Sequence, residues 1–188
     1  MTHPYSEFND IYEAGLIASK MKEAQLRRAR FYNLLQIFEL ASGVDGGTAE
    51  VGCFRGLSSW LMCRATKTKD PSFTGKSHTI IDSFEGLSAP VKEDKVGQEF
   101  AGRFGDTSVE HVRQTLQDFP DVSIIKGWVP AVFETLPEEC YRFVHIDVDL
   151  YEPTLSSLQY FYSRVSRGGY LVVDDFGPWP QGGNYVGC

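Results

Sequence analysis

Four aspartates follow two short apolar runs of the sequence. Asp147 and Asp149 come after one run, and Asp174 and Asp175 come after the other. If these runs are neighbouring parallel strands, the carboxylates meet at one edge of a sheet, where like charges repel unless protons or a cation compensate. A hard divalent ion such as Mg²⁺ prefers oxygen ligands, so the cluster predicts a cation site, although two of the four could instead cap helices and face water. His145 lies on the apolar run before Asp147 and is expected in the core or in support of the cluster.

A glycine-containing turn follows an earlier apolar run. Gly52 and Gly56 would let the backbone turn tightly and approach a ligand, and Ser58 and Ser59 would begin a helix whose amide groups favour an anionic group. A plain strand–helix turn is the alternative. The spacing G-x-x-x-G differs from the G-x-G-x-x-G of nicotinamide-dependent dehydrogenases. The turn also lacks the second glycine of a serine hydrolase's nucleophile elbow.

Two further strand ends carry groups that suit a nucleoside. Asp82 follows an apolar run, and an acid in that place can accept both hydroxyls of a ribose, or it can cap the next turn. Trp128 follows Gly127 after another run, where its indole could stack on an adenine ring or pack in the core.

Strands and helices alternate after residue 47. The strands are expected at residues 48–51, 78–81, 122–125, 143–146 and 170–173. The helices are expected at residues 58–65, 108–119 and 153–165. Thr107 and Glu110 have the spacing of a capping box for the second helix, and residues 167–169 are expected to end the third. The pattern predicts a Rossmann-like, doubly wound α/β fold whose mostly parallel sheet binds ligands beyond its carboxyl edge.

The first 45 residues have apolar positions at helical spacing. We expect residues 1–45 to form an N-terminal helical arm, with residues 5–17 acting as a lid, and residues 46–188 to form one domain. Basic residues between Lys20 and Arg30 alternate with acidic and apolar ones. They predict the solvent-facing side of a helix rather than a site for a polyanion.

Composition excludes several classes of protein. The chain has 188 residues and a net charge of −7, so it is a poor candidate for binding nucleic acid or anionic membranes. It has no apolar run long enough to span a membrane and no basic-then-apolar leader. Its four cysteines, Cys53, Cys63, Cys140 and Cys188, lack disulfide or metal-ligand spacing. Free thiols in a reducing cytoplasm are therefore expected.

Taken in order, these motifs resemble the macrocin O-methyltransferase family of class I S-adenosylmethionine-dependent enzymes. More distantly, they resemble the metal-dependent catechol-type O-methyltransferases. The resemblance covers residues 48–177 and rests on Ala49-Glu50-Val51-Gly52, Arg55-Gly56-Leu57-Ser58-Ser59, Asp82-Ser83-Phe84-Glu85-Gly86-Leu87, Gly127-Trp128 with Thr135-Leu136-Pro137, Asp147 through Thr154, and Gly168-Gly169-Tyr170 with Val173-Asp174-Asp175-Phe176.

The resemblance implies a role for each matching position. The methionine end of S-adenosylmethionine would be held by Gly52, Phe54 and Ser58, with Glu50 and Ser59 in support. Asp82, with Ser83 beside it, would bind the ribose, and Gly127 and Trp128 would line the adenine pocket. The Mg²⁺ ligands would be Asp147, Asp174 and Asp175.

The reaction implied is methylation of a small-molecule hydroxyl, by default on a sugar or another secondary metabolite. Coordination to a divalent cation makes a hydroxyl a better nucleophile at neutral pH. Catechol-type enzymes have a lysine three positions after the first metal-binding aspartate, where this chain has Leu150. A carboxylate, Asp147 or Asp149, is therefore expected to be the catalytic base.

The family's usual C-terminal strands have no counterpart in the twelve residues from Gly177 to Cys188. The strand at residues 170–173 is then expected to be an apolar sheet edge, covered by a partner subunit, as in a homodimer, or by a longer natural chain. The alternative function is a truncated, catalytically silent domain that binds the cofactor or a partner chain.

Overall fold

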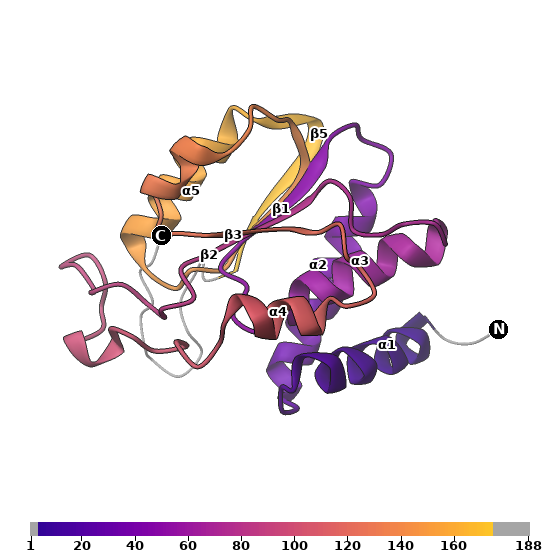
Figure 1. Cartoon of the computed structure of the whole chain (residues 1–188), viewed down its shortest axis with the longest axis horizontal. Helices are drawn as coiled ribbons and strands as arrows, with labels where there is room; N and C mark the ends of the chain where they lie inside the picture. The colour runs from indigo at the N-terminus through magenta and orange to yellow at the C-terminus, as the bar shows by residue number, and fades with distance from the viewer. Residues whose placement is uncertain (1–3, 175–188) are drawn as a thin grey trace.

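A computed structural model describes residues 4–174 and shows a five-stranded sheet between two layers of helices (Figure 1). The strand order is β3-β2-β1-β4-β5, and every pair of neighbouring strands is parallel. The strands are β1 (Gly47–Val51), β2 (His78–Asp82), β3 (Ser123–Lys126), β4 (Tyr141–Ile146) and β5 (Val165–Val173). The helices are α1 (Pro4–Ser19), α2 (Gln25–Leu40), α3 (Leu57–Lys69), α4 (Val109–Thr115) and α5 (Tyr151–Tyr162), with the short 3-10 helices η1 (Gln98–Phe100) and η2 (Ala131–Thr135). The predicted doubly wound α/β architecture is confirmed.

Alternate residues of each strand serve different layers, as the two-residue period of a strand requires. Phe143 of β4 and Ile80 of β2 belong to the apolar core on the side of α1–α4. Val144 and Ile146 belong to the core on the other side, where Phe161 of α5 packs. Because the sheet is covered on both faces, its ligand-accessible region is the edge at the carboxyl ends of the strands.

The end of α5 and the start of β5 correct one prediction. Residues 167–169 do not end a helix: α5 ends at Tyr162, and these residues lie inside β5. Gly168 has φ +88°, and the pairing of β4 with β5 shifts register between Tyr141 and Phe143. A glycine in the left-handed region bends a strand at a bulge as well as it ends a helix, so the sequence signal was ambiguous.

The cap of α4 is displaced by one residue from its prediction, and the helix is shorter, ending at Thr115. Ser108 is the N-cap residue, and its Oγ accepts a hydrogen bond of 3.1 Å from the His111 amide. Thr107 instead donates its hydroxyl hydrogen to the carbonyl oxygen of Phe54. The expected capping box is therefore replaced by a contact that ties α4 to the turn after β1.

The N-terminal arm forms two helices that pack on the rest of the chain. α1 packs against α3 and α4, and α2 packs against α3 and β5. Tyr12 of α1 is fully buried, and Phe31 of α2 is nearly so. The arm thus shares the apolar core of the sheet, and its separation from residues 46–188 as a distinct unit stays a prediction. None of the helices between residues 4 and 174 has the length and apolar character needed to cross a membrane.

Candidate active site

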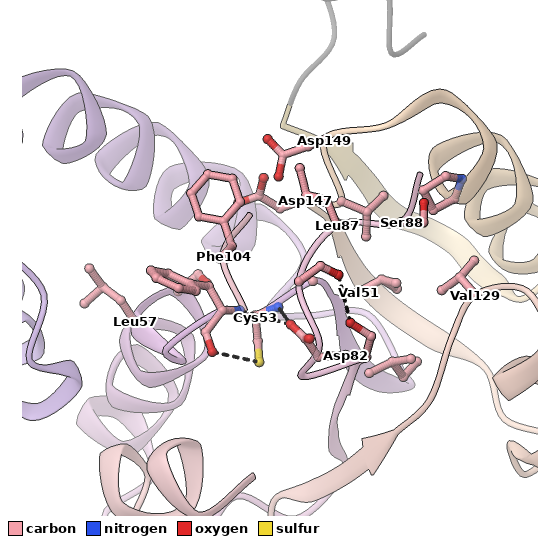
Figure 2. A pocket seen from close by; sticks show the side chains of 18 of the residues that line it. Val51, Cys53, Leu57, Asp82, Leu87, Ser88, Phe104, Val129, Asp147 and Asp149 are labelled. Atoms are coloured by element: carbon pink, nitrogen blue, oxygen red, sulfur yellow. Dashed lines mark hydrogen bonds between the residues drawn. The ribbon is translucent and has the colours of Figure 1, made fainter. Parts of the chain in front are cut away.

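A cavity of about 260 Å³ lies at the carboxyl ends of the strands. The carboxyl end of β2 and the segments that follow β1, β3 and β4 contribute to its lining Asp82, Gly52, Trp128 and Asp147, and α2 contributes Arg30. The cavity includes the place where β1 and β4 lie side by side and the order of the strands reverses, which is the usual ligand site of such sheets. Figure 2 shows Asp147 and Asp149 together on one side of the cavity, with Asp82 further down beside Cys53.

The turn after β1 requires its first glycine. Gly52 has φ +83°, and a Cβ placed there would lie 1.9 Å from the carbonyl oxygen of Asp147. Only glycine can therefore bring the turn after β1 so close to the segment after β4. Phe54, two residues on, is a bulky residue with φ +49°, and its ring packs edge-on against Phe104 with centroids 5.4 Å apart. Such conformations are costly for a bulky side chain and are concentrated at ligand sites.

Asp82 holds this turn through both carboxylate oxygens. Its Oδ2 accepts hydrogen bonds from the amides of Cys53 (2.8 Å) and Phe54 (3.1 Å), and its Oδ1 accepts one from the amide of Phe84 (2.7 Å). The capping alternative is thus present in the structure. Asp82 also lines the cavity, and the two backbone amides already occupy both lone pairs of Oδ2, so one lone pair of Oδ1 remains for a ribose hydroxyl; ribose binding stays a prediction.

The predicted adenine-site residues also lie at the cavity. Trp128 is 41% exposed and donates its indole hydrogen to Glu85 across 3.3 Å, which excludes the alternative of core packing. A Cβ on Gly127 would lie 2.6 Å from a methyl carbon of Val132, so this glycine is needed for packing. Ser83 lines the cavity as well.

Of the three remaining cofactor candidates, only Ser58 lines the cavity. Glu50 and Ser59 have no exposed surface and lie beneath it. The hydroxyl of Ser59 donates to Glu50 Oε2, and His145 Nδ1 lies 2.8 Å from Glu50 Oε1. In the structure, Glu50 therefore holds the side chains of Ser59 and His145 in place and does not line the cavity itself.

The buried contacts continue beyond Glu50 in both directions. His78 Nε2 lies 2.9 Å from Ser59 Oγ, and His78 Nδ1 lies 2.7 Å from Thr48 Oγ1. Burial lowers the pKa of His78 to about 4, so this imidazole is neutral at pH 7. Burial also acts to lower the pKa of His145, but its contacts with Asp174 and Glu50 outweigh it and raise that pKa to about 10. In return, His145 holds the pKa of Glu50 below its usual value in spite of burial.

Two of the three carboxylates predicted to bind a cation, Asp147 and Asp174, lie close together in the part of the chain that the structure describes. Ligand atoms of His145, Asp147 and Asp174 all lie within 4.8 Å of one another. Burial would raise the pKa of Asp174, but His145 and Arg30 hold it below the usual value, so the carboxylate is charged. The donor set fits a divalent ion held by Asp147 and Asp174. Asp175 lies outside the described residues.

Asp149 lines the same cavity with a left-handed backbone, φ +60°. The next residue, Leu150, is 1% exposed and is the N-cap residue of α5. The carboxyl group of Asp149 thus lies beside the candidate cation site, whereas Leu150, at the position where catechol-type enzymes have a lysine, is buried.

Arg30 is a site residue that the sequence reasoning missed. Its Nη2 contacts Asp174 Oδ2 and lies 3.7 Å from Asp147 Oδ2, and Arg27, one turn earlier, also lines the cavity. The prediction that this basic run forms the solvent-facing side of a helix did not include that Arg27 and Arg30 also line the cavity. Arg27 lies four residues before the buried Phe31 and Arg30 four residues before the buried Leu34, which places both beside the apolar stripe of α2; this spacing was the available signal.

Asp94 is a second residue that the sequence did not reveal. It is 9% exposed, and its Oδ1 accepts a hydrogen bond of 2.7 Å from the amide of Tyr151, the first residue of α5. Its Oδ2 accepts one of 2.8 Å from the amide of Val91. Because α5 begins two residues after Asp149, this long-range hydrogen bond from Asp94 fixes the loop that carries the catalytic candidates.

Comparison with known proteins identifies similar O-methyltransferases. The chain is 28% identical to demethyldecarbamoylnovobiocin O-methyltransferase of Streptomyces niveus over 158 residues, which cover 78% of this chain and 60% of that protein. It is 29% identical to an 8-demethyl-8-(2,3-dimethoxy-alpha-L-rhamnosyl)-tetracenomycin-C 4'-O-methyltransferase of Streptomyces olivaceus, covering 73% of this chain and 55% of that one. The chain thus spans less than two thirds of the length of these relatives.

Solved structures give the same result for the fold. The O-methyltransferase NovP matches with a TM-score of 0.65 and 28% identity, over 78% of this chain and 64% of that chain. The calicheamicin methyltransferase CalS11 matches with a TM-score of 0.69 over 93% of this chain and 80% of that chain; at 16% identity, it supports the fold alone. The family model of Macrocin-O-methyltransferase (TylF) matches residues 18–186. The chain therefore belongs to the macrocin O-methyltransferase family.

Proposed function

We propose that the chain transfers a methyl group from S-adenosylmethionine to a hydroxyl of a small molecule, with Mg²⁺ at the carboxylates. The similar proteins are named as O-methyltransferases of demethyldecarbamoylnovobiocin and of a tetracenomycin C derivative that carries a rhamnosyl group. A sugar or another secondary-metabolite hydroxyl is therefore the proposed acceptor.

One observation carries the proposal: a single cavity is lined by the nucleoside-type residues Asp82 and Trp128 and by the acidic pair Asp147 and Asp149. A donor and an acceptor that share one cavity can be aligned for in-line transfer, which is where orientation contributes most to rate. The turn at Gly52, held by Asp82, would bind the methionine end of the donor.

The acceptor hydroxyl would bind at the acidic side of the cavity. A divalent ion bound by Asp147 and Asp174 would lower the pKa of such a hydroxyl and fix its position. Asp149, which lines the cavity beside them, would accept the proton. The apolar side chains of Leu57 and Val129 also line the cavity and would limit water around the reacting atoms.

The test pairs two equivalent substitutions, Asp82→Asn and Asp174→Asn. Each keeps the size of the side chain and removes one charge. Asp82→Asn should weaken binding of S-adenosylhomocysteine at least about tenfold, because its amide nitrogen cannot replace a carboxylate oxygen that accepts from backbone amides. Asp174→Asn should weaken binding of Mn²⁺, the probe used here for the proposed Mg²⁺ site, by a similar factor or more. Isothermal titration calorimetry measures both affinities for both variants.

Each variant serves as the control for the other. If S-adenosylhomocysteine does not bind the unaltered chain at millimolar concentration, the proposed function is wrong. If both variants lose both ligands equally while their circular dichroism is native, the division of the site is wrong. Binding of both ligands with no methyl transfer to any hydroxylated acceptor would favour the catalytically silent alternative.

The cytoplasmic location and the homodimer remain predictions.

A further inference from the structure

A positively charged side chain lies at the proposed cation site. Arg30 extends from α2, and its guanidinium contacts Asp174 and lies 3.7 Å from Asp147. The two carboxylates are largely buried, with side chains 12% and 23% exposed, whereas the Arg30 side chain is 42% exposed. The three groups come from three different elements: α2, and the segments that follow β4 and β5.

The guanidinium compensates the repulsion of the paired carboxylates. Two carboxylates close together favour uptake of a proton by one of them, and a nearby cation opposes this. Arg30 accordingly contributes to the lowered pKa of Asp174, after the effects of burial and of His145. The arginine is thus part of the charge balance of the site.

A guanidinium and a divalent ion compete for the same carboxylate oxygens. Both bind through carboxylate lone pairs, and their charges repel over a few ångströms in a partly buried place. The carboxylates come from strand ends, whereas Arg30 has a long, partly exposed side chain that can rotate outward at low cost. The arginine is therefore the group that would move when an ion binds.

We propose that Arg30 is a built-in competitor for the divalent ion: it occupies the carboxylates of Asp147 and Asp174, and metal binding displaces it. This inference rests on the proposed function only in taking these two carboxylates as metal ligands. Because Arg30 belongs to α2, loading of the metal is coupled to the N-terminal arm. The proposal predicts that removal of the Arg30 side chain from the site strengthens binding of the divalent ion.

The test is the affinity for Mn²⁺, measured by calorimetry and by electron paramagnetic resonance of free Mn²⁺. Arg30→Gln should bind Mn²⁺ at least about tenfold more tightly than the unaltered chain, because the competing charge is gone. Arg30→Lys keeps the charge, and its affinity should stay closer to that of the unaltered chain. Arg27→Gln is the matched control: it removes the same charge one turn earlier on α2, where the guanidinium bonds the carbonyl of Lys22, and should change the affinity by less than about threefold.

Unchanged or weaker Mn²⁺ binding by Arg30→Gln would overturn the proposal, as would equal tightening by Arg27→Gln. No Mn²⁺ binding by any of these proteins would overturn it too. Should Arg30→Gln fail to fold, Arg30→Met gives the same comparison. S-adenosylhomocysteine binding, titrated in parallel, reports on the proposed function separately: its retention alongside a failed Mn²⁺ prediction would discard the role of Arg30 and leave the cofactor site intact.

Discussion

At the scale of residues, an unusual feature is a charged side chain placed inside the sheet. Glu50 is fully buried, which is costly for a carboxylate unless its lone pairs are used. Ser59 and His145 both hydrogen-bond to it, and His78 extends the network through Ser59. The network ends beside Asp174, so the shape of the cation site depends on buried groups that are not among the residues lining the described cavity.

His78 gives this network a measurable pH dependence. The pKa of His78 is lowered by burial from 6.5 to about 4. As pH falls below 6.5, the unfolded chain takes up a proton that the folded chain binds only near pH 4, so the free energy of unfolding falls across that window. His78→Gln removes this contribution. It should reduce the loss of stability between pH 7.5 and pH 5 by about 2 kcal/mol, measured by urea unfolding at both pH values.

The test compares the change in the free energy of unfolding between two pH values. Any loss of stability that replacing the imidazole causes equally at both pH values therefore cancels. An equal loss of stability on acidification in His78→Gln and in the unaltered chain would contradict the expectation. It would mean that other groups, such as carboxylates that become protonated, account for the whole acid dependence.

At the scale of elements, the candidate site depends on the start of α5. Asp94 lies far from Tyr151 in the sequence, yet it accepts the hydrogen bond of that amide and places a negative charge at the helix N-terminus. Asp94→Ala should cost about 1–2 kcal/mol in the free energy of unfolding. It should also weaken Mn²⁺ binding, because the loop with Asp147 and Asp149 loses its anchor. Urea unfolding and calorimetry measure the two effects.

Ser108→Ala is the matched control for Asp94→Ala. It removes the N-cap of α4, which has the same hydrogen-bonding role but belongs to a helix on the other face of the sheet. Both variants should lose stability, and only Asp94→Ala should lose affinity for the ion. Equal loss of Mn²⁺ affinity in both would show that general destabilisation, and not the anchoring of the loop, is responsible.

The elements also show what the sequence could and could not predict. Apolar runs followed by Asp82 and Asp147 located the strand ends and their shared edge, because burial and the two-residue period are local signals. Asp94 was not predictable, and for Arg30 the helical pattern could indicate only its place beside the apolar stripe, since only the tertiary fold brings their partners near. The division of roles between Ser58 and Ser59 was implied by the family resemblance and not by local pattern, because adjacent residues at a helix start can point to a cavity or to the core.

At the scale of the whole molecule, the arm and the sheet together form the cavity. Met21, from the connection between α1 and α2, lines the cavity together with Arg30 and Phe31 of α2. The predicted lid at residues 5–17 forms most of α1, which packs against α3 and α4 (Figure 1). A ligand in the cavity would therefore contact the arm through the connection after α1 and through α2, so closure of the lid is best sought at that connection.

Limited proteolysis of this connection tests whether the arm closes. Lys20 and Lys22 are trypsin sites between α1 and α2 and flank the cavity-lining Met21. Cleavage there requires local opening, and a ligand that binds only the closed arm lowers the population of the open arm by a factor of one plus the ratio of ligand concentration to dissociation constant. S-adenosylhomocysteine at 100 times its dissociation constant should slow this cleavage by up to about 100-fold. Lys76 precedes β2, at the amino ends of the strands, and its cleavage rate is the internal control. Equal slowing at Lys76 would indicate stabilisation of the whole fold, and unchanged cleavage at Lys20 and Lys22 would show that the arm does not respond to the ligand.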